Sequence, residues 1–98
     1  MSASREPHFG KASLQTVEIG RHTIAFRVFN AKSDRCPVMM IHGFGGSQSS
    51  WQLCVDEILS NNTVITMDLP GHGSSSKEVE TGDREELVAC VTGLMDAL

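Results

Sequence analysis

Apolar and polar residues alternate along two short runs near the start of the chain, residues 17–19 and 24–28. The pair Gly20-Arg21 lies between these runs. Because side chains alternate between the two faces of a strand, two such runs around a glycine-containing turn predict an antiparallel hairpin. The polar face of each run indicates that the hairpin lies at the margin of a sheet.

Two further strands are predicted by apolar runs rather than by alternation. Pro37–Ile41 is short, opens with a proline and is typical of a strand buried on both faces. Val64–Met67 predicts a second buried strand. A glycine-rich loop follows each run, at residues 42–47 and at residues 68–74.

Helical periodicity follows each of these loops. Ser49 and Gln52 have capping-box spacing, and the apolar residues behind them predict a helix of about three turns that ends at residues 61–62. Asp83 and Glu86 give the same signal for a last helix, which is still apolar where the chain stops and has no C-cap signal. The continuous apolar face of this helix comprises Leu87, Val88, Val91, Leu94, Met95 and Leu98.

Strands that alternate with helices predict an α/β fold with a parallel sheet built from right-handed crossovers. A chain of 98 residues is expected to form one small domain or a piece of a larger one. Its 40% apolar and 20% charged content is ordinary for a globular protein. The net charge of −4 leaves no basic stripe, so neither nucleic acid nor an anionic membrane is an expected partner.

The three cysteines cannot all pair and none forms a C-x-x-C, which indicates a reducing environment. The N-terminus lacks the apolar region of a secretory signal, and no apolar run is long enough to span a membrane. We therefore expect a soluble, cytoplasmic protein. Cys54 and Cys90 are expected to pack on apolar helix faces, Cys36 to be a loop thiol, and His8 and His22 to lie at the surface.

The loop His42-Gly43-Phe44-Gly45-Gly46 carries the most chemical information. It leaves a predicted buried strand and enters a helix, and its glycines let the backbone approach a ligand closely. Backbone N–H groups held in such a loop stabilise a developing oxyanion. The loop is therefore a candidate oxyanion-hole element.

This loop, with Trp51 in the next helix and the segment D-L-P-G-H-G-S-S at residues 68–75, resembles the α/β-hydrolase family. The resemblance covers nearly all of residues 13–98 and implies the N-terminal part of an α/β-hydrolase sheet, behind a flexible lead-in of residues 1–12. In that family the H-G-x motif donates one oxyanion-hole N–H, which places the donor on the backbone of Phe44. The resemblance assigns the oxyanion hole and substrate binding to Gly43, Phe44 and Gly45, and structural roles to His42, Asp68, Gly71 and Gly73.

No nucleophile, acid or general base is identified. The family's G-x-S-x-G elbow follows its fifth strand, and its acid and histidine come later still. Residues 45–49 and 73–77 lack the final glycine and are not elbows. Dinucleotide, Walker and zinc-ligand spacings are absent from the sequence, so no cofactor or metal is expected.

The polar motif residues also have structural interpretations. His42 is expected to brace its loop by hydrogen bonding to backbone rather than to act in catalysis, and His72 to line or flank the cleft. The carboxylate of Asp68 is expected to bind N–H groups of the following turn. Trp51 is expected in the helix core, whereas the side chain of Phe44 fits pocket lining and packing equally well.

The leading hypothesis is a partial α/β-hydrolase whose full-length relatives resemble serine hydrolases acting on small-molecule esters or related acyl compounds. Phe44 disfavours haloalkane dehalogenases and iminopeptidases, and leaves esterase, lipase-like, C–C bond hydrolase and acyltransferase relatives open. The alternative is a non-catalytic remnant or interaction module. In the family's sheet order the third strand would lack one neighbour here, which predicts a marginally stable chain that self-associates through that edge.

Overall fold

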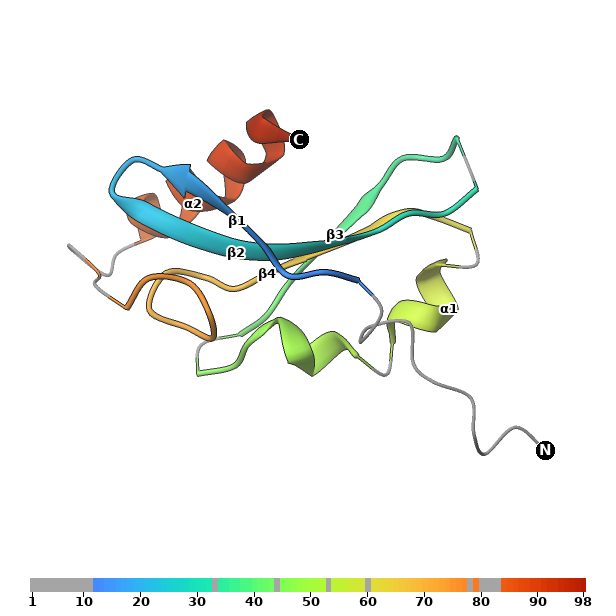
Figure 1. Ribbon diagram of the computed structural model, residues 1–98, viewed down its shortest axis with the longest axis horizontal. Helices are drawn as coiled ribbons and strands as arrows, with labels where there is room; N and C mark the ends of the chain where they lie inside the picture. The colour runs from blue at the N-terminus through green and yellow to red at the C-terminus, as the bar shows by residue number, and fades with distance from the viewer. Residues whose placement is uncertain are drawn as a thin grey trace.

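The computed structural model describes residues 12–32, 34–43, 45–52, 54–59, 61–77, 79 and 84–98. The expected lead-in of residues 1–12 lies outside these residues, except for Ala12. The elements in chain order (Figure 1) are β1 (Gln15–Ile19), β2 (His22–Phe29), β3 (Val38–Ile41), the 3-10 helix η2 (Gln48–Trp51), α1 (Val55–Leu59), β4 (Val64–Met67) and α2 (Arg84–Ala97).

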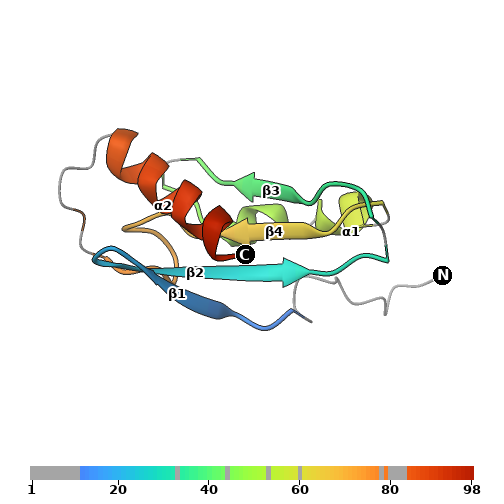
Figure 2. The same cartoon turned by 90° about the horizontal axis from the view of Figure 1, so that it is seen from above.

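The strands form one mixed sheet in the order β1-β2-β4-β3 (Figure 2). β1 pairs with β2, and β2 with β4, in antiparallel fashion, whereas β3 and β4 are parallel. The predicted α/β class, with an antiparallel hairpin followed by parallel strands, is confirmed. β4 lies inside the sheet although it is the last strand in the sequence.

The hairpin forms as the alternating pattern predicts. β1 and β2 pair from Gln15 opposite Phe26 to Ile19 opposite His22, around the turn at residues 20–21. β1 is largely exposed, as expected for a strand at the margin. β2 differs because it has a partner on each side, and most of its residues are buried.

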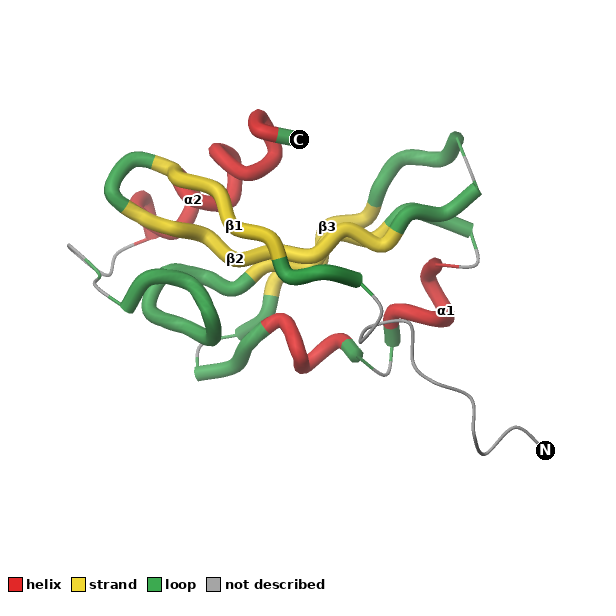
Figure 3. Tube along the Cα trace, viewed as in Figure 1, coloured by secondary structure: helices red, strands yellow, loops and turns green. Residues whose placement is uncertain are grey.

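Helices cover both faces of the sheet (Figure 3). Since successive strand residues face opposite sides, β4 contributes Met67 to one core and Val64 to the other. The core under α2 contains Ile24, Phe26, Met67, Leu69, Cys90 and Leu94, and the core on the η2 and α1 face contains Phe29, Val55 and Val64.

The prediction that Pro37–Ile41 is buried on both faces is wrong. Val38, Met39 and Met40 are only partly buried, and Ile41 is 42% exposed. The strand lies at the edge of the sheet and pairs only with β4 among the described residues. An apolar run indicates that a strand can be buried. How much of its surface is buried depends on the elements that pack against it.

The prediction of a single three-turn helix after the first glycine-rich loop is also wrong. The chain instead forms η2 and the short α1, between which Cys54 is exposed rather than packed. The Ser49–Gln52 capping box does not form as expected, because Ser49 lies inside η2 and the residue at its N-cap is Ser47. Trp51 lies in η2 and packs against the core of Phe29, Val55 and Val64, but it is only partly buried.

α2 spans most of the predicted last helix, and its capping residue Asp83 lies outside the described residues. Cys90 and Leu94 are buried, which confirms the packing role of Cys90. The rest of the predicted apolar face is not fully covered, because Val88, Met95 and Leu98 are at least 50% exposed. The helix therefore buries a stripe narrower than the sequence pattern suggests.

Gly93 lets α2 lie close to β1, because a Cβ at this position would meet Cγ2 of Ile19 at 2.5 Å. We predict that Gly93→Ala lowers the free energy of unfolding by roughly 1–3 kcal/mol through overpacking. This outcome opposes helix propensity, which favours alanine over glycine by about 1 kcal/mol. Urea unfolding followed by circular dichroism measures the change.

The Ile19→Ala background supplies the control. It removes the Cγ2 atom, so Gly93→Ala should there be neutral or stabilising. An equal loss of stability in both backgrounds would show that the contact with Ile19 is not the cause.

Candidate active site

Two loops meet at one edge of the sheet. Residues 42–48 follow β3 and residues 68–76 follow β4. β3 and β4 run parallel with Ile41 opposite Met67, so both loops begin at the carboxyl ends of neighbouring strands. The two glycine-rich motifs of the sequence therefore lie side by side, although η2, α1 and β4 separate them in the chain.

Asp68 joins the two loops through its buried carboxylate, which is 2% exposed. Its Oδ1 accepts a hydrogen bond from the Gln48 N–H at 2.6 Å. Its Oδ2 accepts from Gln48 Nε2 and from the Ser74 N–H, each at 3.0 Å. The bond from Ser74 is the predicted tie to the following turn, and the two bonds from Gln48 were not foreseen.

Gln48 is oriented by a further buried hydrogen bond, because Thr66 Oγ1 donates to its Oε1 at 2.7 Å. Thr66 lies on β4, so the sheet fixes the amide that binds Asp68. Sequence reasoning missed Gln48. A buried carboxylate needs several N–H donors, and this need could have prompted a search for a donor such as Gln48.

The glycines of the second loop permit its tight path around Asp68. A Cβ on Gly73 would lie 2.4 Å from Asp68 Cγ, and its φ of +50° is one that other residues rarely adopt. Gly71 donates its N–H to the Ser76 carbonyl at 2.7 Å and closes the turn. Glycine is required at position 73 because the carboxylate occupies the space of any side chain.

Ser75 anchors the second loop to the sheet. Its buried hydroxyl donates to the Asp68 carbonyl at 2.6 Å and accepts the Ala25 N–H at 2.9 Å. The hydroxyl at this motif position is thus fully used within the fold. It is no candidate nucleophile in this arrangement.

His42 braces the loops as the sequence predicts. The ring is 4% exposed, and its Nδ1 lies 2.7 Å from the Gly43 carbonyl. Its Nε2 accepts the Leu69 N–H at 3.0 Å. The Gly43 carbonyl also accepts the Gly46 N–H, so Gly43 closes the first loop through its backbone.

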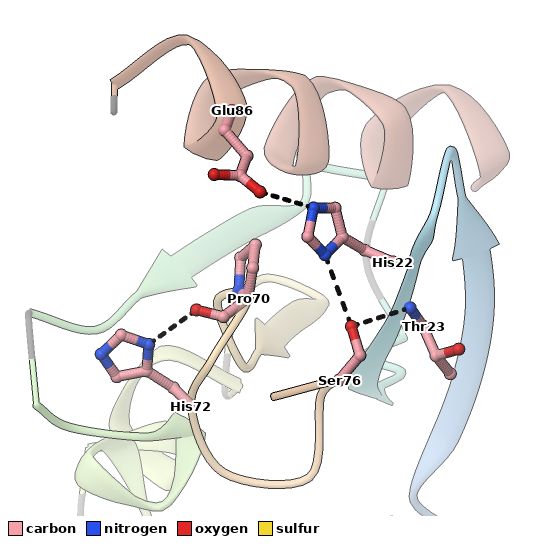
Figure 4. Close-up of polar contacts among 6 residues, drawn as sticks. All are labelled: His22, Thr23, Pro70, His72, Ser76 and Glu86. Atoms are coloured by element: carbon pink, nitrogen blue, oxygen red, sulfur yellow. Dashed lines mark hydrogen bonds and ion pairs between the residues drawn. The ribbon is translucent and has the colours of Figure 1, made fainter. Parts of the chain in front are cut away.

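His72 makes the matching contact in the opposite direction. Its Nδ1 lies 2.9 Å from the Pro70 carbonyl (Figure 4), and its Nε2 accepts the Gly45 N–H at 2.9 Å. The rings of His42 and His72 have centroids 4.9 Å apart. The two histidines thus occupy the junction between the loops.

A cleft of about 570 Å³ opens between the two loops and α2. This volume is within the range of small-molecule sites. Phe44, the expected oxyanion donor, lies outside the described residues. The cleft is lined by Gly45, Gly46, Leu69, Pro70, Gly71, His72, Gly73, Lys77, Val79 and Leu87.

The expectation that His22 lies at the surface is wrong, because the residue is 8% exposed. Its Nε2 lies 2.8 Å from Oε2 of Glu86, and its Nδ1 lies 3.4 Å from Oγ of Ser76 (Figure 4). The Ser76 hydroxyl also accepts the Thr23 N–H at 3.2 Å. This serine, histidine and glutamate connect β2, the second loop and α2, and none of them lines the cleft. We interpret them as an anchor for α2.

The described residues contain no group of three or more histidine, cysteine or acidic residues placed to hold a metal ion. Burial raises the pKa of the Cys90 thiol, and the nearby charge of Glu86 raises it further. A thiol that remains protonated is a poor nucleophile. Cys36 is an exposed loop residue, as expected.

Comparison with known proteins identifies the family. Residues 38–98 match the family model described as "Alpha/beta hydrolase family". The chain belongs to the α/β-hydrolase family. Its membership fits the geometry, in which both signature loops meet at the carboxyl ends of β3 and β4.

Two curated proteins show the extent of the similarity. The chain is 40% identical over 62 residues to the dihydrolipoyllysine-residue acetyltransferase component of the acetoin cleaving system of Pseudomonas putida, covering 63% of this chain and 17% of that protein. It is 41% identical over 54 residues to the (lyso)-N-acylphosphatidylethanolamine lipase of Homo sapiens, covering 55% and 16%. The chain therefore spans about one sixth of the length of these relatives.

A solved structure extends the likeness across the fold. The crystal structure of a membrane phospholipase A, a bacterial virulence factor, superimposes with a TM-score of 0.81 and 24% identity, covering 93% of this chain and 29% of that one. At this identity the likeness concerns the fold alone. Separately, no helix within the described ranges is long and apolar enough to cross a membrane.

Asp68→Asn is predicted to lower the free energy of unfolding by roughly 1.5–3 kcal/mol, since hydrogen bonds to charged groups are worth this much. The carboxylate accepts three N–H donors, and an amide would turn an NH2 group toward at least one of them. Chemical denaturation measures the loss.

Ser74→Ala is the matched control. Ser74 donates to Asp68 through its backbone and has an exposed side chain, so this variant should stay within about 0.5 kcal/mol of the original. If both variants were equally stable, the carboxylate would not be what holds the loops.

Proposed function

We propose that this chain supplies the oxyanion-hole half of a serine-hydrolase-type active site. The proposed donor is the backbone N–H of Phe44, and Gly43 and Gly45 shape the loop on either side. The observation that carries the proposal is the brace around this loop. Three separate side chains, His42, Asp68 and His72, hold the flanking residues against the second loop beside a cleft.

The brace matters because an oxyanion donor acts through preorganisation. An N–H that already points at the developing charge needs no reorganisation when the reaction occurs. The Gly45 N–H is already bonded to His72 and the Gly46 N–H to Gly43. Neither of these two N–H groups is therefore proposed as the donor, which the family motif assigns to Phe44. The nucleophile, acid and general base are proposed to come from residues outside these 98.

The proposed substrates are small-molecule esters or related acyl compounds. The acetyltransferase component of Pseudomonas putida and the human lipase both carry acyl chemistry in their names. The cleft combines backbone of the glycine loops with the apolar side chains of Leu69, Val79 and Leu87. Such a lining suits an acyl group whose carbonyl faces the loop and whose chain contacts the apolar wall.

A chimera tests the donor. The matching segment of the human lipase would be replaced by that of this chain, in forms carrying Phe44→Ala or Phe44→Pro. Proline removes the backbone N–H and alanine keeps it. We expect the proline form to have a kcat about 10²–10³-fold below that of the alanine form, because this is the usual cost of losing one oxyanion donor.

Ester hydrolysis under steady-state conditions gives kcat and KM for both forms. A change confined to KM, or equal kcat values, would place the oxyanion donor elsewhere. An inactive chimera that folds as judged by circular dichroism would show that this segment does not complete such a site.

The exposed edge of β3 favours a second candidate function, pairing with another chain. β3 has a strand partner on one side only among the described residues, and Ile41 at its end is 42% exposed. An apolar groove of about 460 Å³ lies on the α2 face of the sheet, lined by Val28, Pro37, Met39, Ile65, Met95 and Leu98. An open strand edge is a template for strand addition, and the proposed occupant is a second copy of this chain.

Sedimentation velocity tests this association. We expect the average mass to rise with concentration, and Ile41→Lys to suppress the rise because a charge on an edge strand opposes pairing. Val88→Lys is the control, since Val88 is 50% exposed but lies on α2 rather than on β3. A monomer at all concentrations, or equal effects of the two lysines, would reject pairing through β3.

A further inference from the structure

The two loops exchange one hydrogen bond in each direction through their histidines. His42 belongs to the first loop and accepts the Leu69 N–H of the second. His72 belongs to the second loop and accepts the Gly45 N–H of the first. Each ring therefore holds the backbone of the opposite loop, and the rings lie 4.9 Å apart at the junction.

The partners of each ring define its protonation state. A carbonyl oxygen only accepts, so Nδ1 of His42 must carry the proton shared with Gly43, and Nδ1 of His72 the proton shared with Pro70. A backbone N–H only donates, so the Nε2 atom of both rings must be unprotonated. Both histidines are therefore neutral and in the Nδ1–H tautomer.

We propose that His72 is a positioning residue that fixes the glycine loop only in this neutral form and releases the loop at Gly45 when it takes up a second proton. Protonation places an N–H at Nε2, directly opposite the Gly45 N–H. Two donors cannot bond to each other, so the contact is lost. His42 acts in the same way at Leu69, but it is 4% exposed and also closes its own loop. His72 is the more accessible half of the pair.

Among the described residues, three charged side chains of the surrounding segments have partners of their own. Asp68 is bonded to Gln48 and Ser74, Lys77 donates to the Gly73 carbonyl, and Glu86 of α2 pairs with His22. Within the described part of the chain, the ring of His42 faces that of His72 across the junction.

The relevance of the His72–Gly45 contact to catalysis rests on the proposed function. Gly45 directly follows the proposed oxyanion donor, so release of its N–H loosens the segment that must stay fixed. A hydrolase built on this loop would then have a less firmly held oxyanion donor. The physical claim about His72 and Gly45 can be tested without any activity.

Nuclear magnetic resonance of the 15N-labelled 98-residue chain provides the test. A long-range 1H–15N spectrum at pH 8 should show Nδ1 of His72 protonated and Nε2 bare. Lowering the pH should move the Gly45 amide resonance along the same titration curve as the His72 ring. Amide hydrogen exchange then reports how firmly each loop is held.

Two variants give crossed controls. His72→Phe keeps a flat ring but removes the acceptor, so the Gly45 N–H should exchange about tenfold faster while the Leu69 N–H keeps its rate. His42→Phe should show the reverse. General loosening would accelerate both amides in both variants, which would reject a specific contact. If His42→Phe does not fold, the tautomer and the His72→Phe result still decide the matter.

The outcomes separate this inference from the proposed function. An Nε2–H tautomer, or a Gly45 amide that ignores the titration of His72, would overturn the positioning role. The chimera result at Phe44 would stand whatever that outcome. Conversely, a Gly45 amide that follows His72 supports the positioning role even if Phe44 proves not to be the donor.

Discussion

The arrangement of the site depends on the buried carboxylate of Asp68. Burying a charge costs several kcal/mol unless the protein replaces the lost water with hydrogen bonds. Asp68 obtains them from Gln48, where the first loop enters η2, and from Ser74 in its own loop. Both loops must therefore turn their N–H groups toward one point. Gly73 is the clearest consequence, because the carboxylate fills the space of any side chain there.

The histidines act within the frame that Asp68 and the parallel strands create. Pairing of β3 with β4 brings the loops together, and Asp68 sets their separation. Only then do the rings of His42 and His72 reach the backbone of the opposite loop. The carboxylate contacts thus depend on the strand pairing, and the histidine contacts depend on both. The contact of His72 with the Gly45 N–H lies next to the proposed oxyanion donor, Phe44.

Much of this structure could be predicted because its causes are local. Alternation predicts the β1–β2 hairpin, and the motif around Asp68 predicts its bond to Ser74. The pairing of His22 with Glu86 could not be predicted, since the two residues are 64 positions apart and no spacing rule connects them. The open edge of β3 follows from the family's sheet order, but the partial exposure of its side chains was missed for a related reason. Its residues are apolar enough for burial, but what covers a strand is decided by other elements.

The sheet order carries a consequence for the route by which the chain folds. β3 precedes β4 in sequence, yet among the described residues it joins the sheet only through β4, which itself pairs with β2. During synthesis, residues 38–41 therefore stay without a strand partner until residues 64–67 have emerged from the ribosome. Non-local pairing of this kind is slow and leaves apolar side chains exposed meanwhile. The segment that leads into the glycine loop therefore gains its strand partner only after residues 64–67 have been synthesised.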